Sequence, residues 1–222
     1  MPVIEKVYER GAWPDVRIAP ASPRALGPGA RLLAAAAAVI THGDQPRVFT
    51  TLARHRGLFR WWLPFAGKLL LRTELPRADV ELVVLRTACN CLSWYEWAQH
   101  ARLARRAGLS EAAIEAVSRW AHPTVSDVWT ERQLLLLRAT DELHARRVIT
   151  DTTWSALRAW LGERELIELC MLVGHYEMLA MTLNSLGVEA EPSAIASLDA
   201  GATHTADRLR VALTRQREVS RP

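Results

Sequence analysis

The spacing of apolar residues along this chain predicts helices almost throughout. Between Asp79 and Cys89, valines and leucines recur at helical spacing, and acidic residues occupy the first turn, where the helix dipole favours them. Ser93-Trp-Tyr-Glu96 then matches a capping box that opens a second helix, which stops at Gly108. No segment alternates apolar and polar residues for long enough to form a strand. The pattern therefore predicts an all-α fold.

Prolines, glycines and capping residues delimit the other expected helices, of which there should be roughly eight to ten in total. Pro64 should kink or divide one of them. A weak repeat aligns Glu81-Leu-Val-Val-Leu with Glu165-Leu-Ile-Glu-Leu and suggests two related helical hairpins. The expected helices cover residues 29–41, 48–55, 58–72, 79–89, 93–106, 110–120, 130–144, 150–161 and 164–185.

The chain divides into three parts by composition. Residues 1–28 are rich in proline and predict an extended arm, which Tyr8 and Trp13 would anchor on a neighbouring subunit or on the same domain. Residues 29–190 form the helical domain, and residues 191–222 are expected to be a C-terminal surface segment.

Composition and charge narrow the class of protein. The 222 residues are 50% hydrophobic and 23% charged, as expected of a globular domain. The net charge of +4 is scattered among acids, so nucleic-acid binding is not expected. The N-terminus does not resemble a signal peptide, and the longest apolar run, 32–40, is about half a membrane span, so we expect a cytoplasmic protein with no membrane partner.

Three cysteines, Cys89, Cys91 and Cys170, are too few for a disulfide framework and fit a reducing compartment. Cys89 and Cys91 are separated by one residue, which is not the spacing of a redox or zinc Cys-x-x-Cys motif. We expect all three to be structural thiols.

Candidate chemistry is concentrated on one helix face. Ser93, Glu96 and His100 stand at i, i+3 and i+7, and Glu96 and His100 are close enough in sequence to hydrogen-bond. A carboxylate beside an imidazole can move protons at neutral pH. The surrounding Trp94, Tyr95 and Trp97 would desolvate Glu96 and raise its pKa. The alternative is that Ser93 and Glu96 only cap the helix and that His100 is solvated.

Several segments resemble the carboxymuconolactone decarboxylase family, in its branch that reads Tyr-Glu-Trp before the histidine. The resemblance spans about residues 58–188 and implies an AhpD-like (alkylhydroperoxidase D-like) orthogonal helical bundle, which commonly forms homo-oligomers such as dimers, trimers or hexamers. The segments that carry it are 81–86 (ELVVLR), 94–100 (WYEWAQH), 103–110 (LARRAGLS), 141–144 (DELH) and 176–187 (YEMLAMTLNSLG).

The resemblance also suggests roles for individual residues. Peroxidase members carry a glutamate, two cysteines and a histidine, at positions that map here onto Glu81, Ser93, Glu96 and His100. Serine and carboxylate cannot cycle through a disulfide, which argues against peroxidase activity. Decarboxylase-type members imply cofactor-free acid–base chemistry on a small carboxylated lactone. The expected catalytic residues are then Glu96 as acid, His100 as proton shuttle, and Glu81 orienting His100.

The expected substrate-binding residues are Ser93, Trp94, Tyr95 and Trp97, with Arg86 or Arg102 holding a substrate carboxylate. Either arginine can instead be a surface ion-pair partner.

Metal and cofactor binding are not expected. The residues His144, His175 and Glu177 lack the two Glu-x-x-His units of a di-iron bundle. His175 and Tyr176 are read most simply as core residues. The leading hypothesis is a decarboxylase, lactone-opening enzyme or isomerase acting on a small molecule. The alternatives are an antioxidant peroxidase and a non-catalytic binding or assembly protein.

Overall fold

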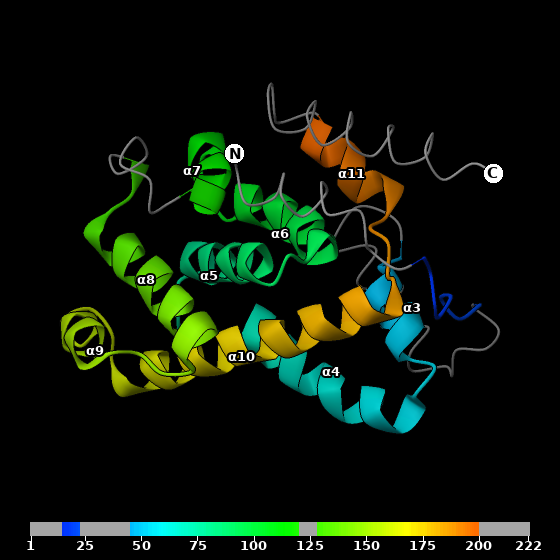
Figure 1. Ribbon diagram of the computed structural model, residues 1–222, viewed down its shortest axis with the longest axis horizontal. Coiled ribbons are helices and arrows are strands. Elements are labelled where there is room, and N and C mark those ends of the chain that lie inside the picture. Colours follow the sequence, from blue (N-terminus) through cyan, green and yellow to red (C-terminus); the bar gives the residue numbers. More distant parts are fainter. Residues whose placement is uncertain (1–14, 23–44, 120–127, 200–222) are drawn as a thin grey trace.

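The computed structural model describes residues 15–22, 45–119 and 128–199, and this part of the chain contains helices and no strand (Figure 1). The prediction of an all-α fold is confirmed. Within these residues the α-helices are α3 (Arg47–Leu52), α4 (Arg56–Leu71), α5 (Arg77–Asn90), α6 (Trp94–Arg106), α7 (Glu111–Ala116), α8 (Glu131–Arg146), α9 (Asp151–Leu157), α10 (Glu163–Leu186) and α11 (Pro192–Asp199), and a short 3-10 helix, η1 (Val117–Arg119), follows α7.

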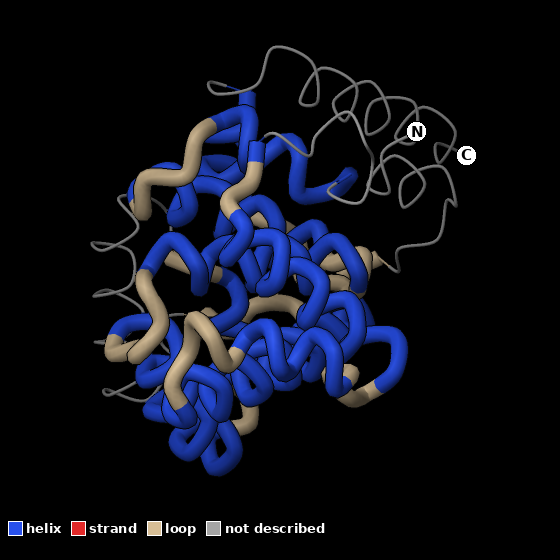
Figure 2. Tube along the Cα trace, turned by 90° about the vertical axis from the view of Figure 1, so that its left-hand side faces the viewer, coloured by secondary structure: helices blue, strands red, loops and turns tan. Residues whose placement is uncertain are grey.

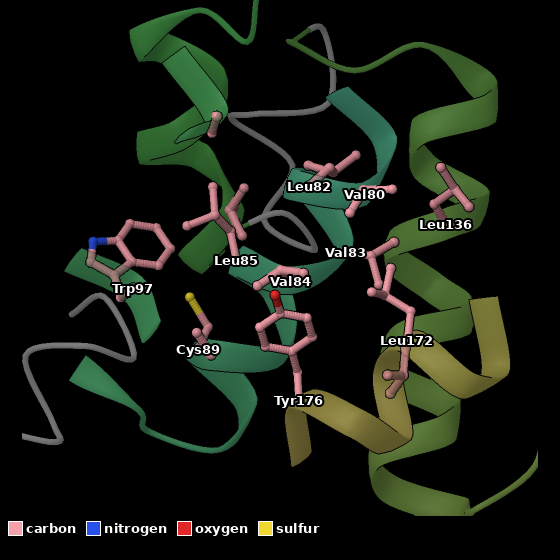
Figure 3. Packing of buried hydrophobic residues seen from close by; sticks show 14 of the residues in the cluster. Val80, Leu82, Val83, Val84, Leu85, Cys89, Trp97, Leu136, Leu172 and Tyr176 are labelled. Atoms are coloured by element: carbon pink, nitrogen blue, oxygen red, sulfur yellow. The ribbon is translucent and has the colours of Figure 1, made fainter. Parts of the chain in front are cut away.

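Helix α5 lies at the centre of the bundle, packed between α6, α8 and α10 (Figure 1). A view turned by 90° shows the described part of the chain as helices joined by loops (Figure 2). Its run of valines and leucines is apolar on every side, as suits a helix that is surrounded. Val80 and residues 82–85 are wholly buried, and Leu136 of α8 and Leu172 of α10 pack around them (Figure 3). Anything carried by α5 is therefore held rigidly.

Most helix ends follow the sequence signals. Thr130 and Gln133 form the predicted capping box of α8, and the Thr150 hydroxyl caps α9. Gly187 ends α10 with φ 65°, a left-handed conformation that favours glycine. Pro64 lies inside the single helix α4 and does not divide it.

The weak internal repeat is not seen. Its first copy is the α5–α6 hairpin, which turns at Leu92, a non-glycine residue with φ 57°. The second copy falls on α10, which runs without interruption from Glu163 to Leu186. The similarity reflects shared helical periodicity and not a second hairpin.

The structure describes a part of each end of the chain. Residues 15–22 of the arm bind their own chain, since the Arg17 and Ile18 amides donate to the Leu186 carbonyl. The expected 29–41 helix, Tyr8 and Trp13 lie outside the described residues. Residues 192–199, in the segment expected at the surface, form α11, whose Ala194 and Leu198 are buried in the core.

An apolar surface runs along α4 and α10, which lie against each other. Helix α10 also has the length and composition of a membrane span, although 56% of its most apolar 18-residue window is buried in this fold, as in the core helix of a globular domain. The exposed members of this α4–α10 surface are Leu58, Trp61, Phe65, Leu71, Ile167, Met171, Met178 and Met181.

Candidate functional site

The α5–α6 hairpin brings His100 against Glu81. His100 Nδ1 lies 2.7 Å from Glu81 Oε2, and the Glu81 side chain is fully buried. Arg77, one turn earlier on α5, forms an ion pair with the other Glu81 oxygen. An ionised carboxylate only accepts hydrogen bonds, so the proton is on Nδ1. His100 Nε2 is then the nitrogen available for proton transfer.

Glu96 lies in the first turn of α6 and is 1% exposed. Among the described residues neither of its carboxyl oxygens has a hydrogen-bond partner. Burial raises the pKa of Glu96 well above its usual range. The nearby Ser93 hydroxyl lowers that pKa only in part, and its geometry is not that of a hydrogen bond. Burial therefore favours the neutral, protonated form of the Glu96 carboxyl.

Two expectations about Glu96 are thereby corrected. Ser93 occupies the N-cap position of α6, but its side chain makes no capping bond, so the capping box read from the sequence is not formed. The expected hydrogen bond between Glu96 and His100 is also not formed, because His100 Nδ1 binds Glu81 instead. Glu96 is buried without the structural role that would have explained it.

A chain of aromatic contacts leads away from His100. The Tyr176 ring stands at 90° to the His100 ring, with centroids 5.0 Å apart, and Tyr176 reaches from α10 towards α5 (Figure 3). His175 contacts Tyr176, Trp62 stacks on His175, and Phe65 meets it edge-on. Burial and the charge of His100 lower the pKa of His175 to about 4. His175 is therefore a neutral imidazole.

The sequence predicts His175 and Tyr176 most simply as core residues. The available signal was an adjacent His-Tyr pair inside an otherwise apolar helix. It could not show that the pair lies between His100 and a cleft.

That cleft is formed by α3, α4, α10 and residues 17–19, and has a volume of about 1250 Å³. Trp62 and Phe65 lie on its wall, and the chain of aromatic contacts from there to His100 passes through His175 and Tyr176. Arg17, Arg54 and Arg56 line it, and the described lining includes no acidic residue. The cleft combines an apolar interior with positive charge.

The aromatic residues expected to bind substrate lie in packed surroundings. The Tyr95 hydroxyl accepts from the Val48 amide at 3.1 Å and donates to Glu191 at 3.0 Å. Trp97 is buried near Leu85 and Cys89 (Figure 3). Trp94 is half-buried and packs against the same core.

Glu191 was not anticipated from the sequence. Its buried carboxylate receives bonds from Tyr95, from Gln99 and from the Arg47 amide, and so joins α6 and α3 to the segment that leads into α11. Burial raises the pKa of Glu191, opposed by these bonds and by the charge of Arg47.

The two arginines proposed to hold a substrate carboxylate are engaged within the protein. Arg86 forms a bidentate ion pair with Asp141, at 2.6 and 3.0 Å, and also donates to the Val117 carbonyl. Arg102 donates to Gln99 at 2.9 Å. Arg86 in particular is committed to linking α5 with α8.

The cysteines form no redox pair. All three are free thiols. Burial raises the pKa of Cys89 to about 12, and burial together with the charges of Glu177 and Glu96 raises that of Cys91 to about 12. Burial also raises the pKa of Cys170. Because the thiolate is the reactive form, these thiols are poor nucleophiles.

The helical bundle has an AhpD-like fold, as its likeness to two solved structures shows. An uncharacterized peroxidase-related protein of Ralstonia eutropha JMP134, with an alkylhydroperoxidase AhpD core, superposes with a TM-score of 0.73 at 18% identity, covering 82% of this chain and 96% of that one. An uncharacterized peroxidase-related protein of Silicibacter sp. TM1040 gives 0.68 at 13% identity, with the same coverage.

Residues 56–142 match the model of the carboxymuconolactone decarboxylase family. The matched segment includes Glu81, Glu96 and His100. No functionally curated protein matches the sequence.

Proposed function

We propose that this protein is a small-molecule enzyme that uses Glu96 and His100 for acid–base chemistry and needs no redox cysteine. The observation that supports this most directly is the fully buried Glu96 carboxyl, which has no hydrogen-bond partner among the described residues. An unpaired buried carboxyl destabilises a fold by about 1–3 kcal/mol. Such a group is characteristic of functional sites.

His100 supplies the base in this proposal. Glu81 fixes its tautomer and stabilises the imidazolium, so that Nε2 can remove a proton and later return it. Arg77 holds the second Glu81 oxygen and so limits rotation of the carboxylate. The arrangement resembles other carboxylate–histidine pairs in which the carboxylate orients the ring without itself taking the proton.

Glu96 supplies the acid. Its raised pKa favours the protonated form, which carries a transferable proton, and its position one turn before His100 places both groups on the same side of α6. With a proton removed at one atom and added at another, the pair supports isomerisation or lactone opening. Protonation of the carbon that loses carbon dioxide supports decarboxylation.

The substrate is proposed to be a small carboxylated molecule. The cleft beside Trp62 has an apolar interior for its body, and Arg17, Arg54 and Arg56 favour its negative charge. These arginines replace Arg86 and Arg102 as the candidates for carboxylate binding because they line the cleft, although Arg17 and Arg54 also donate to the Ser185 and Ala19 carbonyls. Movement of Trp62, Phe65, His175 and Tyr176 would connect the cleft with His100.

Peroxidase activity is the alternative that the names of the structural neighbours suggest. The two positions of the redox pair hold Ser93 and Glu96, and the high pKa values of Cys89 and Cys91 disfavour a thiolate mechanism. The acid–base function is therefore the one we favour.

The deciding experiment measures turnover of a panel of carboxylated lactones and 2-oxo acids in D₂O by NMR, which detects isomerisation, ring opening, decarboxylation and deuterium incorporation. Turnover should fall at least ~10²-fold in His100→Ala and in Glu96→Gln. It should persist after alkylation of the accessible thiols. Turnover that survives His100→Ala but is lost on alkylation would instead support the peroxidase alternative.

We also propose that the protein is a cytoplasmic homo-oligomer. The exposed α4–α10 surface supports self-association, because apolar side chains as exposed as Trp61, at 72%, are commonly covered in an assembly.

A further inference from the structure

A cluster of three metal-ligating side chains lies apart from the acid–base pair. Cys91 follows the last turn of α5, His144 is on α8, and Glu177 is on α10. Their sulfur, nitrogen and oxygen atoms all lie within 4.8 Å of one another, and within the described ranges this is the sole group of this kind. Cys91 Sγ is 3.9 Å from His144 Nδ1, which is 2.8 Å from Glu177 Oε1.

We propose that Cys91, His144 and Glu177 bind a zinc ion. Tetrahedral zinc binds sulfur at about 2.3 Å and nitrogen or oxygen at about 2.0–2.2 Å, which places the ligand atoms roughly 3.4–3.6 Å apart. The observed separations of 2.8 and 3.9 Å bracket that value. Side-chain shifts of about 1 Å therefore convert the cluster into a coordination site.

The donor set selects the metal. Thiolate and imidazole suit zinc, whereas calcium and magnesium prefer ligands that are all oxygen. A thiolate and a carboxylate together also neutralise the charge of a divalent ion. Three protein ligands leave a fourth position for water, and the 35% exposure of the His144 side chain gives solvent access to it.

Neighbouring residues already hold the ligands in place. Arg147 pairs with Glu177 Oε2, which orients Oε1 towards His144. Asn184 donates to the Cys91 carbonyl at 3.1 Å and fixes the start of the turn after α5. Contacts of this kind around a metal site orient the ligands and raise its affinity.

Sequence spacing could not show this site. The ligands are 53 and 33 residues apart and come from three helices, so no short motif contains them. The expectation of no metal rested on the missing Glu-x-x-His pairs, which concern a different kind of centre. The proposed zinc site uses none of the acid–base residues, so either proposal can fail without the other.

The test uses the full-length protein, stripped of metal and titrated with zinc against a chromogenic chelator, and with cobalt followed by absorption. We expect one tightly bound zinc per chain and a near-ultraviolet thiolate-to-cobalt band. Cys91→Ser should abolish the band and weaken zinc binding at least ~30-fold, and Glu177→Gln should weaken it ~10-fold or more.

Cys170→Ser is the matched control, because Cys170 lies on α10 outside the cluster, and it should bind zinc as the wild type does. Thermal unfolding without metal checks that each variant folds. Should a variant misfold, cadmium NMR of the wild type still reports whether one sulfur binds the ion. The proposal would be overturned if Cys91→Ser and Glu177→Gln bind zinc as the wild type does. It would also be overturned if the wild type binds no zinc at about 100 micromolar, a dissociation constant that corresponds to about −5 kcal/mol.

Discussion

His100 Nδ1 and Glu81 Oε2 are 2.7 Å apart although 19 residues separate them, and the hairpin of α5 and α6 makes this contact. In Glu81→Gln the amide can donate as well as accept, so the His100 ring is no longer held in one tautomer. We expect turnover to fall ~10²-fold or more. Nitrogen NMR of His100 should show Nδ1 protonated in the wild type and a mixture in the variant.

Glu81→Asn is the comparison variant. It removes the charge as Glu81→Gln does and also shortens the side chain, so the difference between the two variants measures the effect of packing. Both variants should lose about 2 kcal/mol of stability through the broken contacts of Glu81 with Arg77 and His100. A Glu81→Gln variant with an unchanged histidine spectrum would contradict the orienting role.

Glu96→Gln should make the protein more stable at neutral pH. Below about pH 4.3, the ordinary pKa of glutamate, the carboxyl is protonated in both the folded and unfolded states. As the pH rises above that value the unfolded chain ionises while the buried Glu96 keeps its proton, so wild-type stability falls by up to about 1.4 kcal/mol per pH unit until the folded pKa is reached. The variant lacks this loss.

Thermal unfolding measured from pH 4 to 8 checks this prediction. The melting temperatures of wild type and Glu96→Gln should diverge as the pH rises, by roughly 2–4 °C for each kcal/mol. Glu163→Gln is the control, because Glu163 is 84% exposed, and its difference from wild type should stay constant. Curves for Glu96→Gln that run parallel to wild type would show that Glu96 ionises normally.

The sequence predicted the helices well because their signals are local. Val and Leu spacing, the Thr130 cap and the Gly187 stop each act within a few residues. The Ser93-to-Glu96 pattern misled because the same residues that cap a helix can be withdrawn into a core, and only the packing of α6 decides between the two.

The long-range parts of the site were visible only where a resemblance supplied them. The pairing of Glu81 with His100 came from a family pattern. Other features depend on tertiary contacts that periodicity does not encode. These are the contact of Tyr176 with His100, the ion pair of Arg86 with Asp141, and the cluster of Cys91 with residues of two other helices.

The positions of Ser93 and Glu96 allow a redox pair to be introduced. In a Ser93→Cys/Glu96→Cys variant the two thiols lie one turn apart at the start of α6, and we expect them to form a disulfide under mild oxidation. Thiol counting should find two more thiols after reduction than before. Either single variant should show no such change, and a double variant that stays reduced would mean that the side chains cannot approach.

The cleft should bind an anionic aromatic probe such as anilinonaphthalene sulfonate. We expect Arg56→Gln to weaken binding several-fold, because Arg56 lines the cleft. Arg60→Gln is the control: Arg60 lies one turn further along α4 and stacks over the exposed Trp61. Equal effects of the two substitutions would indicate a general charge effect and not a site.

The α4–α10 surface should be a subunit interface. Trp61→Glu and Met181→Glu place charges on exposed apolar positions, and light scattering after size exclusion should show a smaller assembly than for the wild type. Trp154→Glu on α9 should leave the mass unchanged, since Trp154 is exposed outside this surface. A wild type that is monomeric would refute the interface.

The burial of residues 79–85 of α5 links the proposed chemistry to the slowest motions of the protein. Backbone amides at the centre of such a helix exchange with solvent only when the whole domain unfolds. Glu81 therefore keeps His100 aligned during partial unfolding events that let a ligand pass the aromatic side chains between the cleft and His100. Breathing of α4 and α10 can admit and release molecules while the proton-transfer geometry stays fixed for as long as the domain remains folded.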